Sequence, residues 1–200
     1  LSRNPKAKVI FDVKSTRLLA PWIKEHGGDP VMEKTGHSFI KSTMKKTGAL
    51  VAGEMSGHVF FKERWYGFDD GMYAGARLLE ILSAFDNPSE VLNKLPQSIS
   101  TPELNIDLPE GSNGHKVIEE LAANAKFEGA TEIITIDGLR VEFPDGFGLM
   151  RASNTTPILV LRFEADTQEA IERIQNQFKA VIESKDRKST RLNSSHLKLS

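Results

Sequence analysis

The sequence of 200 residues contains no cysteine, which excludes disulfide bonds and thiolate metal sites. It has no apolar run near the ~20 residues of a membrane-spanning helix, so we expect no membrane contact. Basic residues number 26 against 27 acidic ones, and this lack of positive excess argues against nucleic-acid binding. Because 39% of the residues are hydrophobic and 26% are charged, we expect a globular, cytoplasmic protein. The chain begins without Met, and we expect it to be part of a longer protein.

Strands alternate with helices in the first half of the chain. The apolar pattern predicts strands over 8–13, 30–33, 49–52 and 59–62, helices over 17–26 and 38–46, and an amphipathic helix from Asp69. Met72, Ala76, Leu79 and Leu82 fall at core spacing in that last helix, and Pro21 should bend or restart the first one. The alternation predicts an α/β fold, with a mostly parallel βαβ sheet domain over residues 1–97.

The pattern changes after Asn87-Pro88, where we expect a short helix over 89–95 and a linker over 96–102. Further strands are predicted over 103–108, 133–136, 139–143, 147–150 and 158–163, with helices over 116–126 and 167–182. Asp137-Gly138 is a strong hairpin signal. This order, β-α-β-β-β-β-α, predicts a small α+β domain with an antiparallel sheet over residues 98–184. The Ser-rich and basic residues 185–200 are expected to be a disordered, non-native tail.

The stretch GEMSGH (residues 53–58) places three polar side chains, Glu54, Ser56 and His58, between two predicted strands. Three interpretations are open: a solvated turn, a metal site with His37 as third ligand, or a sugar site in which the carboxylate accepts from vicinal hydroxyls. Lys14 and His37 follow predicted strands, and ligands gather beyond the carboxyl ends of parallel strands. This common placement favours the sugar site.

A second polar stretch, RASNTTP (residues 151–157), lies between two predicted strands. The guanidinium of Arg151 matches two phosphate oxygens at once. Ser153, Asn154, Thr155 and Thr156 add neutral donors, and the loop backbone can form an anion-binding nest. The alternative is a surface loop whose polar side chains bond only their own backbone.

GEMSGH followed by FDDG, with RASNTTP further on, resembles the α-D-phosphohexomutase family, in its phosphomannomutase/phosphoglucomutase subgroup. The stretches FDVK and KTGH match as well, and the resemblance covers residues 1–183, the third and fourth domains of the family. It implies an isomerase, an intramolecular phosphotransferase that interconverts hexose 1-phosphate and hexose 6-phosphate through a bisphosphorylated sugar.

The resemblance also implies roles for individual residues. Glu54 and Ser56 would bind the sugar's 3- and 4-hydroxyls, and one of the histidines would assist proton transfer. Met55 favours mannose or glucose substrates. The implied substrate-binding residues are Lys14, His37, Glu54, Met55, Ser56, Gly57 and His58, and the implied phosphate-binding residues are Arg151, Ala152, Ser153, Asn154 and Thr155.

The chain departs from the family pattern in lacking the phosphoserine loop and the Asp-rich loop for Mg²⁺. The resemblance therefore implies that Mg²⁺ is bound by a domain absent from this chain, and that this span contains neither catalytic nor metal-binding residues. Its implied partners are the phosphosugar and the N-terminal domains of the same enzyme. The alternatives are a stand-alone sugar-phosphate-binding module, a fragment of a phosphoglucosamine-type mutase and, more distantly, a nucleic-acid-binding module.

Overall fold

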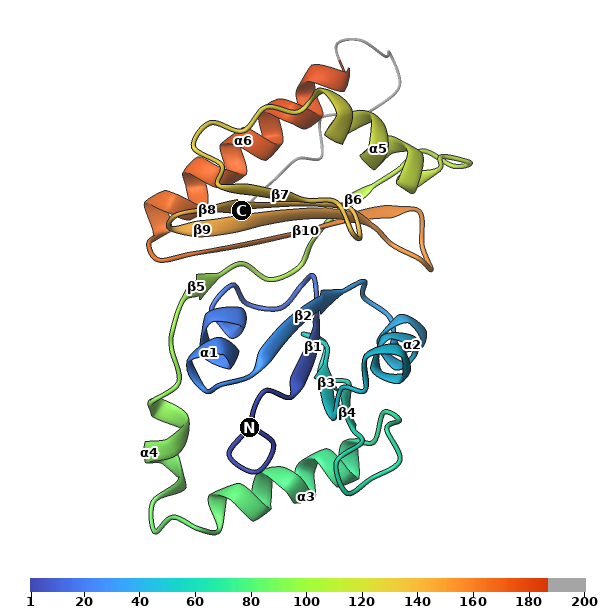
Figure 1. Cartoon of the computed structure of the whole chain (residues 1–200). Coiled ribbons are helices and arrows are strands. Elements are labelled where there is room, and N and C mark those ends of the chain that lie inside the picture. Colours follow the sequence, from blue (N-terminus) through green and yellow to red (C-terminus); the bar gives the residue numbers. More distant parts are fainter. Residues whose placement is uncertain (187–200) are drawn as a thin grey trace. The chain divides into compact units, whose positions relative to one another are not determined.

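The computed structural model describes residues 1–186, and the chain divides into two compact units (Figure 1). Unit 1 comprises residues 1–97, and unit 2 begins at Ser98. Each unit has a hydrophobic core of its own. Of the predicted tail, residues 187–200 lie outside the described residues, whereas residues 185 and 186 form the end of a helix.

Unit 1 is built on a four-stranded sheet with the order β2-β1-β3-β4. The central strand β1 (Lys8–Asp12) is parallel to both β2 (Asp29–Glu33) and β3 (Val51–Gly53), and β4 (Val59–Phe61) is antiparallel to β3. Because β1 lies between the two strands that follow it, the chain reverses its direction of winding at β1. The predicted parallel-rich sheet is confirmed.

Two helices connect the parallel strands of unit 1. The first, α1 (Leu19–Glu25), starts two residues later than predicted, and Pro21 therefore lies in its first turn. A proline there costs no helical hydrogen bond, since N–H groups of the first turn have no partner in the helix. The second helix, α2 (His37–Thr47), buries Ile40 and Met44 against the sheet.

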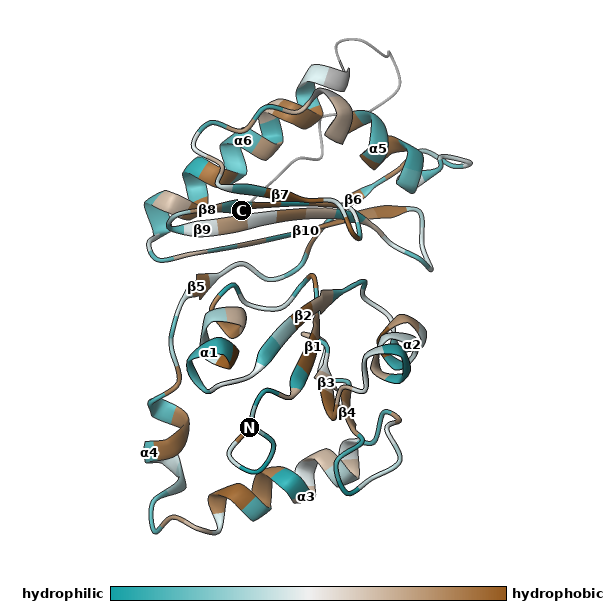
Figure 2. Ribbon diagram, viewed as in Figure 1, coloured by the Kyte–Doolittle hydropathy of each residue, from teal (hydrophilic) through white to brown (hydrophobic). Residues whose placement is uncertain are grey.

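The third helix, α3 (Gly71–Leu82), corrects one prediction: it has no buried residue. Hydrophobic residues colour parts of its ribbon brown in Figure 2, yet Met72 is 88% exposed and Leu79 is 67% exposed. The face that approaches β4 carries Tyr73 and Arg77 instead, and the Arg77 guanidinium lies 4.6 Å from the centre of the Phe61 ring. Polar and aromatic contacts, not an apolar stripe, therefore decide which side of α3 packs.

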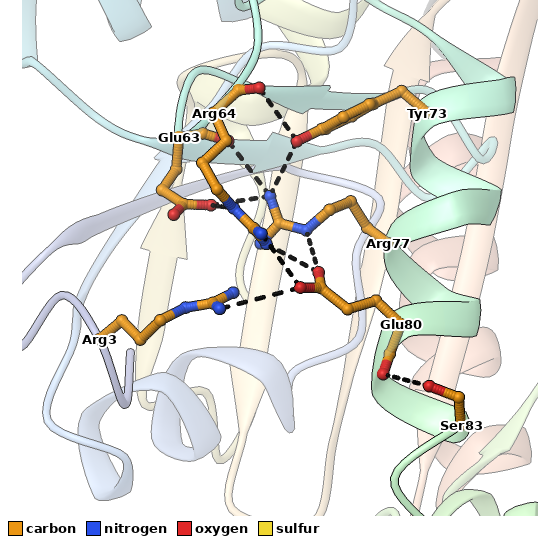
Figure 3. A network of polar contacts seen from close by, with 7 residues as sticks. All are labelled: Arg3, Glu63, Arg64, Tyr73, Arg77, Glu80 and Ser83. Atoms are coloured by element: carbon orange, nitrogen blue, oxygen red, sulfur yellow. Dashed lines mark hydrogen bonds and ion pairs between the residues drawn. The ribbon is translucent and has the colours of Figure 1, made fainter.

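An ion-pair network holds α3 to the segment that follows β4 (Figure 3). Glu80 pairs with Arg64 at 2.7 Å and with Arg77 at 3.2 Å, and Arg77 also pairs with Glu63 at 2.7 Å. Arg3 lies 3.8 Å from Glu80 and extends the network to the start of the chain. Beside it, the ring of Trp65 stacks on that of Tyr73 at 4.3 Å.

Unit 2 contains a six-stranded antiparallel sheet with the order β5-β10-β9-β8-β7, in which β6 also pairs with β10. The strands are β5 (Ile99–Ser100), β6 (Leu104–Asp107), β7 (Glu132–Ile134), β8 (Leu139–Phe143), β9 (Gly146–Ala152) and β10 (Ile158–Ala165). From β6 onward the order is the predicted one. The strand β5 lies in the predicted linker and corrects it, because its residues pair with Glu164 and Ala165. The short helix α4 (Pro88–Asn93) precedes β5 and belongs to unit 1.

Helices α5 (Gly114–Asn124) and α6 (Gln168–Asp186) cover one face of this sheet (Figure 1). Phe178 of α6 is fully buried, with ring contacts to Phe127 and Phe163 at 4.8 and 5.3 Å. Gly148 faces the same ring, and a Cβ at this position would collide with it. Strand and helix therefore approach closely because Gly148 has no side chain. Among residues 1–186, no helix is long and apolar enough to cross a membrane.

Candidate functional site

The polar residues of unit 1 follow the carboxyl ends of three adjacent parallel strands. β1 ends two residues before Lys14, β2 ends shortly before His37, and β3 ends directly before Glu54. Since parallel strands end at one edge of a sheet, the three connections meet there, at the point where the winding direction reverses. Hydrogen bonds between these connections show that the structure brings them together.

The side chain that joins the connections is Asp12, the last residue of β1, which is fully buried. Its carboxylate accepts hydrogen bonds from the Ser15 hydroxyl at 2.8 Å, from the Thr35 hydroxyl at 2.9 Å and from the Met55 backbone N–H at 3.0 Å. A buried carboxylate needs such donors to replace water. Asp12 lies in the FDVK stretch, but it was not among the residues expected to form the site.

Glu54 is the buried member of the GEMSGH stretch, with 8% of its surface exposed. Its Oε1 accepts the backbone N–H of Gly36, a glycine with φ of 133°, a region that other residues rarely adopt. Among residues 1–186 the structure gives no hydrogen bond to Oε2. One carboxylate oxygen is therefore fixed to the α2 connection, and the second is available to a ligand.

The other predicted substrate-binding residues differ in exposure. Lys14 is 8% exposed, whereas His37, Ser56 and His58 are exposed and Met55 is half-buried. The turn between β3 and β4 is closed by two backbone bonds, from the Glu54 N–H to the His58 carbonyl and from the Gly57 N–H to the Glu54 carbonyl, each 2.9 Å. The turn thus presents Ser56 and His58 to solvent from a fixed backbone.

His58 is paired with an aspartate outside the predicted site. Its Nδ1 lies 2.5 Å from Oδ2 of Asp69, which follows β4 by eight residues and forms an isolated bridge with Phe60. A carboxylate acceptor favours the tautomer with hydrogen on Nδ1, which leaves Nε2 as an acceptor. The FDDG stretch contains Asp69, but nothing in its spacing shows that it reaches His58.

In unit 2, the structure places Arg151 and Ala152 in strand β9 rather than in the loop predicted for them. Arg151 pairs with Val160 of β10 and is 5% exposed. Its Nε donates to Oδ2 of Asp137 at 3.0 Å, and its buried Nη2 has no hydrogen-bond partner among the described residues. An unsatisfied buried donor is costly, so this guanidinium suits an anion that would complete its hydrogen bonds.

Asp137 belongs to the Asp137-Gly138 turn, which the sequence marked only as a hairpin. Gly138 has φ of 94°, and a Cβ there would fall 2.7 Å from Cβ of Arg151. The turn therefore packs directly on the arginine that it pairs with. The sequence of a hairpin turn does not reveal which strand residue its carboxylate contacts.

The loop after β9 satisfies many of its own polar groups. The Ser153 hydroxyl accepts the backbone N–H groups of Thr155 and Thr156, each at 3.3 Å, and the Thr156 hydroxyl lies 3.0 Å away. Asn154 and Thr155 are exposed. These bonds match the alternative of a surface loop bonded to its own backbone, so the buried Arg151 distinguishes this site from an ordinary turn.

The metal site considered for the GEMSGH stretch is not found among the described residues. No group of three or more His, Asp or Glu side chains within residues 1–186 is arranged to hold a metal ion. The three-ligand set considered for His37, Glu54 and His58 is therefore not assembled.

Comparisons with known proteins match both units. Residues 1–99 match the model for "Phosphoglucomutase/phosphomannomutase, alpha/beta/alpha domain III", and residues 103–181 match the model for the C-terminal domain of the same family. A phosphoglucomutase of Neisseria meningitidis serogroup A is 91% identical over 184 residues, which are 92% of this chain and 40% of that protein. A phosphomannomutase/phosphoglucomutase of Pseudomonas aeruginosa is 61% identical over 186 residues, 90% of this chain and 40% of that protein.

A crystal structure of a phosphoglucomutase/phosphomannomutase family protein from Burkholderia thailandensis superposes with a TM-score of 0.87 at 59% identity. The match covers 92% of this chain and 39% of that one. The chain thus spans about two fifths of the length of the curated relatives that it matches.

Proposed function

The chain belongs to the phosphoglucomutase/phosphomannomutase family, and we propose that it is the part of such an enzyme that recognises the hexose phosphate. The reaction is the interconversion of hexose 1-phosphate and hexose 6-phosphate through a bisphosphorylated sugar. Unit 1 binds the sugar hydroxyls, and unit 2 binds the phosphate that is not being transferred. Glucose and mannose phosphates are the proposed substrates.

The observation that carries the proposal is the pair of incomplete polar groups, one in each unit. Glu54 has one oxygen fixed by Gly36 and one without a hydrogen bond among the described residues. Arg151 has Nε fixed by Asp137 and a buried Nη2 without a partner. A carboxylate acceptor suits vicinal hydroxyls and a guanidinium suits phosphate, so the chemistry of each group matches one part of a hexose phosphate.

Separate binding sites for the hydroxyls and for the phosphate suit a substrate that must bind in two orientations. In the proposed cycle the bisphosphorylated sugar turns around between two phosphoryl transfers, so that O1 and O6 exchange places. A site that binds hydroxyls together with a separate site that binds the distal phosphate can accept both orientations.

The groups that carry out phosphoryl transfer are proposed to lie elsewhere in the enzyme. Within residues 1–186, no side-chain cluster fits a divalent cation. We assign Mg²⁺ and the phosphoserine, whose family loops this sequence lacks, to the remaining part of the protein. The chain alone should show no conversion of mannose 1-phosphate to mannose 6-phosphate, and measurable turnover by pure chain would contradict this assignment.

Titration calorimetry with Arg151→Ala and Glu54→Gln tests the two recognition roles. Arg151→Ala should weaken every phosphosugar and inorganic phosphate alike, since each charge-assisted hydrogen bond contributes ~1.5–3 kcal/mol. In Glu54→Gln, the amide oxygen can still accept from Gly36, but the ligand then faces a donor where the acceptor was. This variant should weaken binding of glucose 1-phosphate most, binding of galactose 1-phosphate (inverted at C4) less, and binding of inorganic phosphate little.

Two exposed residues supply matched controls: Arg173→Ala in unit 2 and Glu25→Gln in unit 1. Each should change binding by less than ~0.5 kcal/mol, as for ordinary surface substitutions. If Glu54→Gln weakens all three ligands equally, the hydroxyl-binding role is wrong. If Arg151→Ala leaves phosphate binding unchanged, the phosphate-binding role is wrong.

A further inference from the structure

We propose that Asp12 is a positioning residue of the sugar site: its buried carboxylate sets the relative positions of the three connections that carry the proposed ligand-binding groups. The inference rests on the proposed function for the identity of the ligand. It does not assign Asp12 any contact with the sugar.

Each oxygen of Asp12 connects different parts of the edge. Oδ1 accepts from the Ser15 hydroxyl after β1 and from the Met55 N–H after β3, at 2.8 and 3.0 Å. Oδ2 accepts from the Thr35 hydroxyl after β2 at 2.9 Å. One side chain therefore holds a residue from each of the three connections.

These contacts continue into a closed chain that ends at the proposed hydroxyl-binding group. Thr35 precedes Gly36, and the Gly36 N–H donates to Oε1 of Glu54. Glu54 in turn precedes Met55, whose N–H returns to Asp12. Asp12 therefore holds both the segment that donates to Glu54 and the residue that follows Glu54 in the chain. Through these two contacts the Asp12 carboxylate determines where Oε2 of Glu54 lies.

Because Asp12 is buried, its carboxylate favours this arrangement of the three connections over other arrangements. The carboxylate is fully buried, and a charge removed from water is tolerated only where hydrogen bonds replace its hydration. Other positions of the connections would leave the charge without donors. A buried aspartate with a merely structural role would instead stabilise unit 1 as a whole, and its loss would not affect one ligand selectively.

Two substitutions at Asp12 separate geometry from charge. Asp12→Ala removes all three acceptor contacts. Asp12→Asn is the matched control, since its carboxamide oxygen can accept from Ser15 and Met55 while its NH₂ donates to the Thr35 hydroxyl, which can reverse its own role. We expect Asp12→Asn to keep most of the amide protection and of the affinity for glucose 1-phosphate that Asp12→Ala loses.

Amide hydrogen exchange of the chain, followed by NMR, measures the connections without any ligand. In Asp12→Ala the Met55 amide and residues 34–37 and 53–58 should exchange at least about tenfold faster, because they lose their common anchor. The buried strand residues Ile10 and Ala52 should keep their protection. Unchanged exchange at Met55 in Asp12→Ala would overturn the proposal.

Titration with glucose 1-phosphate and with inorganic phosphate measures the consequence for the site. Asp12→Ala should weaken binding of glucose 1-phosphate at least about tenfold, since a binding group must be held close to its productive geometry, and should leave the affinity for inorganic phosphate within twofold. Equal loss of both ligands would overturn the selective role. If the unsubstituted chain binds no glucose 1-phosphate, the proposed function fails, and the exchange measurement still decides whether Asp12 fixes the connections.

A second variant covers the case in which Asp12→Ala unfolds unit 1. Thr35→Val removes one hydroxyl and keeps the shape of the side chain, so Ile10 and Ala52 should remain protected. Like Asp12→Ala, it should speed amide exchange over residues 34–37 and weaken binding of glucose 1-phosphate. No change in either measurement would overturn the proposal.

Discussion

Two aspartate–arginine pairs in unit 2 differ chiefly in burial. The side chains of Asp137 and Arg151 are 9% and 6% exposed, whereas those of Asp145 and Arg173 are both 43% exposed. Removing one partner of a buried pair leaves an uncompensated charge, which costs about 3–5 kcal/mol. We expect Asp137→Ala to lower the free energy of unfolding of unit 2 by about this amount, measured by urea denaturation.

The exposed pair supplies the control. Asp145→Ala should cost no more than about 1 kcal/mol, because solvent screens exposed charges. If both substitutions destabilise unit 2 equally, Asp137 does not hold Arg151 in the way its burial indicates. Asp137→Ala should also weaken binding of inorganic phosphate, since the guanidinium loses the contact that orients its fork.

The contact between Asp69 and His58 leads to a prediction about one proton. With Asp69 as acceptor, the neutral imidazole should have its hydrogen on Nδ1. Asp69→Ala should shift the ring nitrogen ¹⁵N signals of His58 towards the tautomer with hydrogen on Nε2. His26 is an internal control in the same spectra, because its Nδ1 lies 2.8 Å from the Trp22 carbonyl and away from Asp69. Unchanged His58 signals would show that Asp69 does not set the tautomer.

At the scale of residues, sequence patterns pointed to candidate ligand-binding side chains but not to the carboxylates that contact them or their surroundings. Glu54 and Arg151 belong to dense polar stretches between predicted strands, a pattern that the sequence alone shows. Asp12, Asp69 and Asp137 act across gaps of 43, 11 and 14 residues. Such distances depend on strand order and register, which local patterns do not contain.

At the scale of elements, the attachment of α3 should depend on pH. Hydrogen bonds from Arg64 lower the pKa of Glu80. Partial burial opposes ionisation of Glu63, but hydrogen bonds from Arg64 and Arg77 outweigh it and lower the pKa of Glu63 as well. A carboxyl with a lowered pKa in the folded state stabilises that state above its ordinary value of 4.5, and the stabilisation disappears as the pH falls below that value through the lowered pKa.

We therefore expect α3 to loosen at pH values below 4.5, before the sheet of unit 1 unfolds. Trp65 stacks on Tyr73 of α3, so its fluorescence in a Trp22→Phe background reports the change. A Glu63→Gln, Glu80→Gln double variant should show the loosened state already at neutral pH. If the fluorescence change coincides with loss of far-ultraviolet circular dichroism at all pH values, the network does not control α3 separately.

The elements that the sequence misplaced show which forces local patterns omit. The spacing of Met72, Ala76 and Leu79 predicted a packed face on α3, but Arg77 and Tyr73 contact β4 through ring and charge interactions that a hydrophobic pattern ignores. The strand β5 lies in a stretch that read as a linker, because two residues are too few for a period. The long strands and α6 were predicted well, since burial repeats along their whole length.

At the scale of the whole molecule, the separate cores predict separate effects of core substitutions. Phe178 is fully buried in unit 2 and Phe60 in unit 1. Phe178→Ala should cost about 3–5 kcal/mol, from lost burial and the cavity left behind, and should speed hydrogen exchange in β8, β9 and β10. Phe60→Ala should do the same for β1 and β3. Equal loss of protection in both units for either substitution would contradict the separation.

The chain passes between the two compact units once, at Gln97–Ser98, and this single passage has a consequence for inheritance. Asp12, Glu54 and the groups around them are encoded entirely before this point, and Asp137 and Arg151 entirely after it. A genetic crossover at this junction between two related genes would therefore transmit each proposed recognition site whole, together with the residues that contact it. Hybrids joined here should fold and take their hydroxyl selectivity from the first parent, whereas hybrids joined inside unit 1 would combine an aspartate from one ancestor with connections shaped by another.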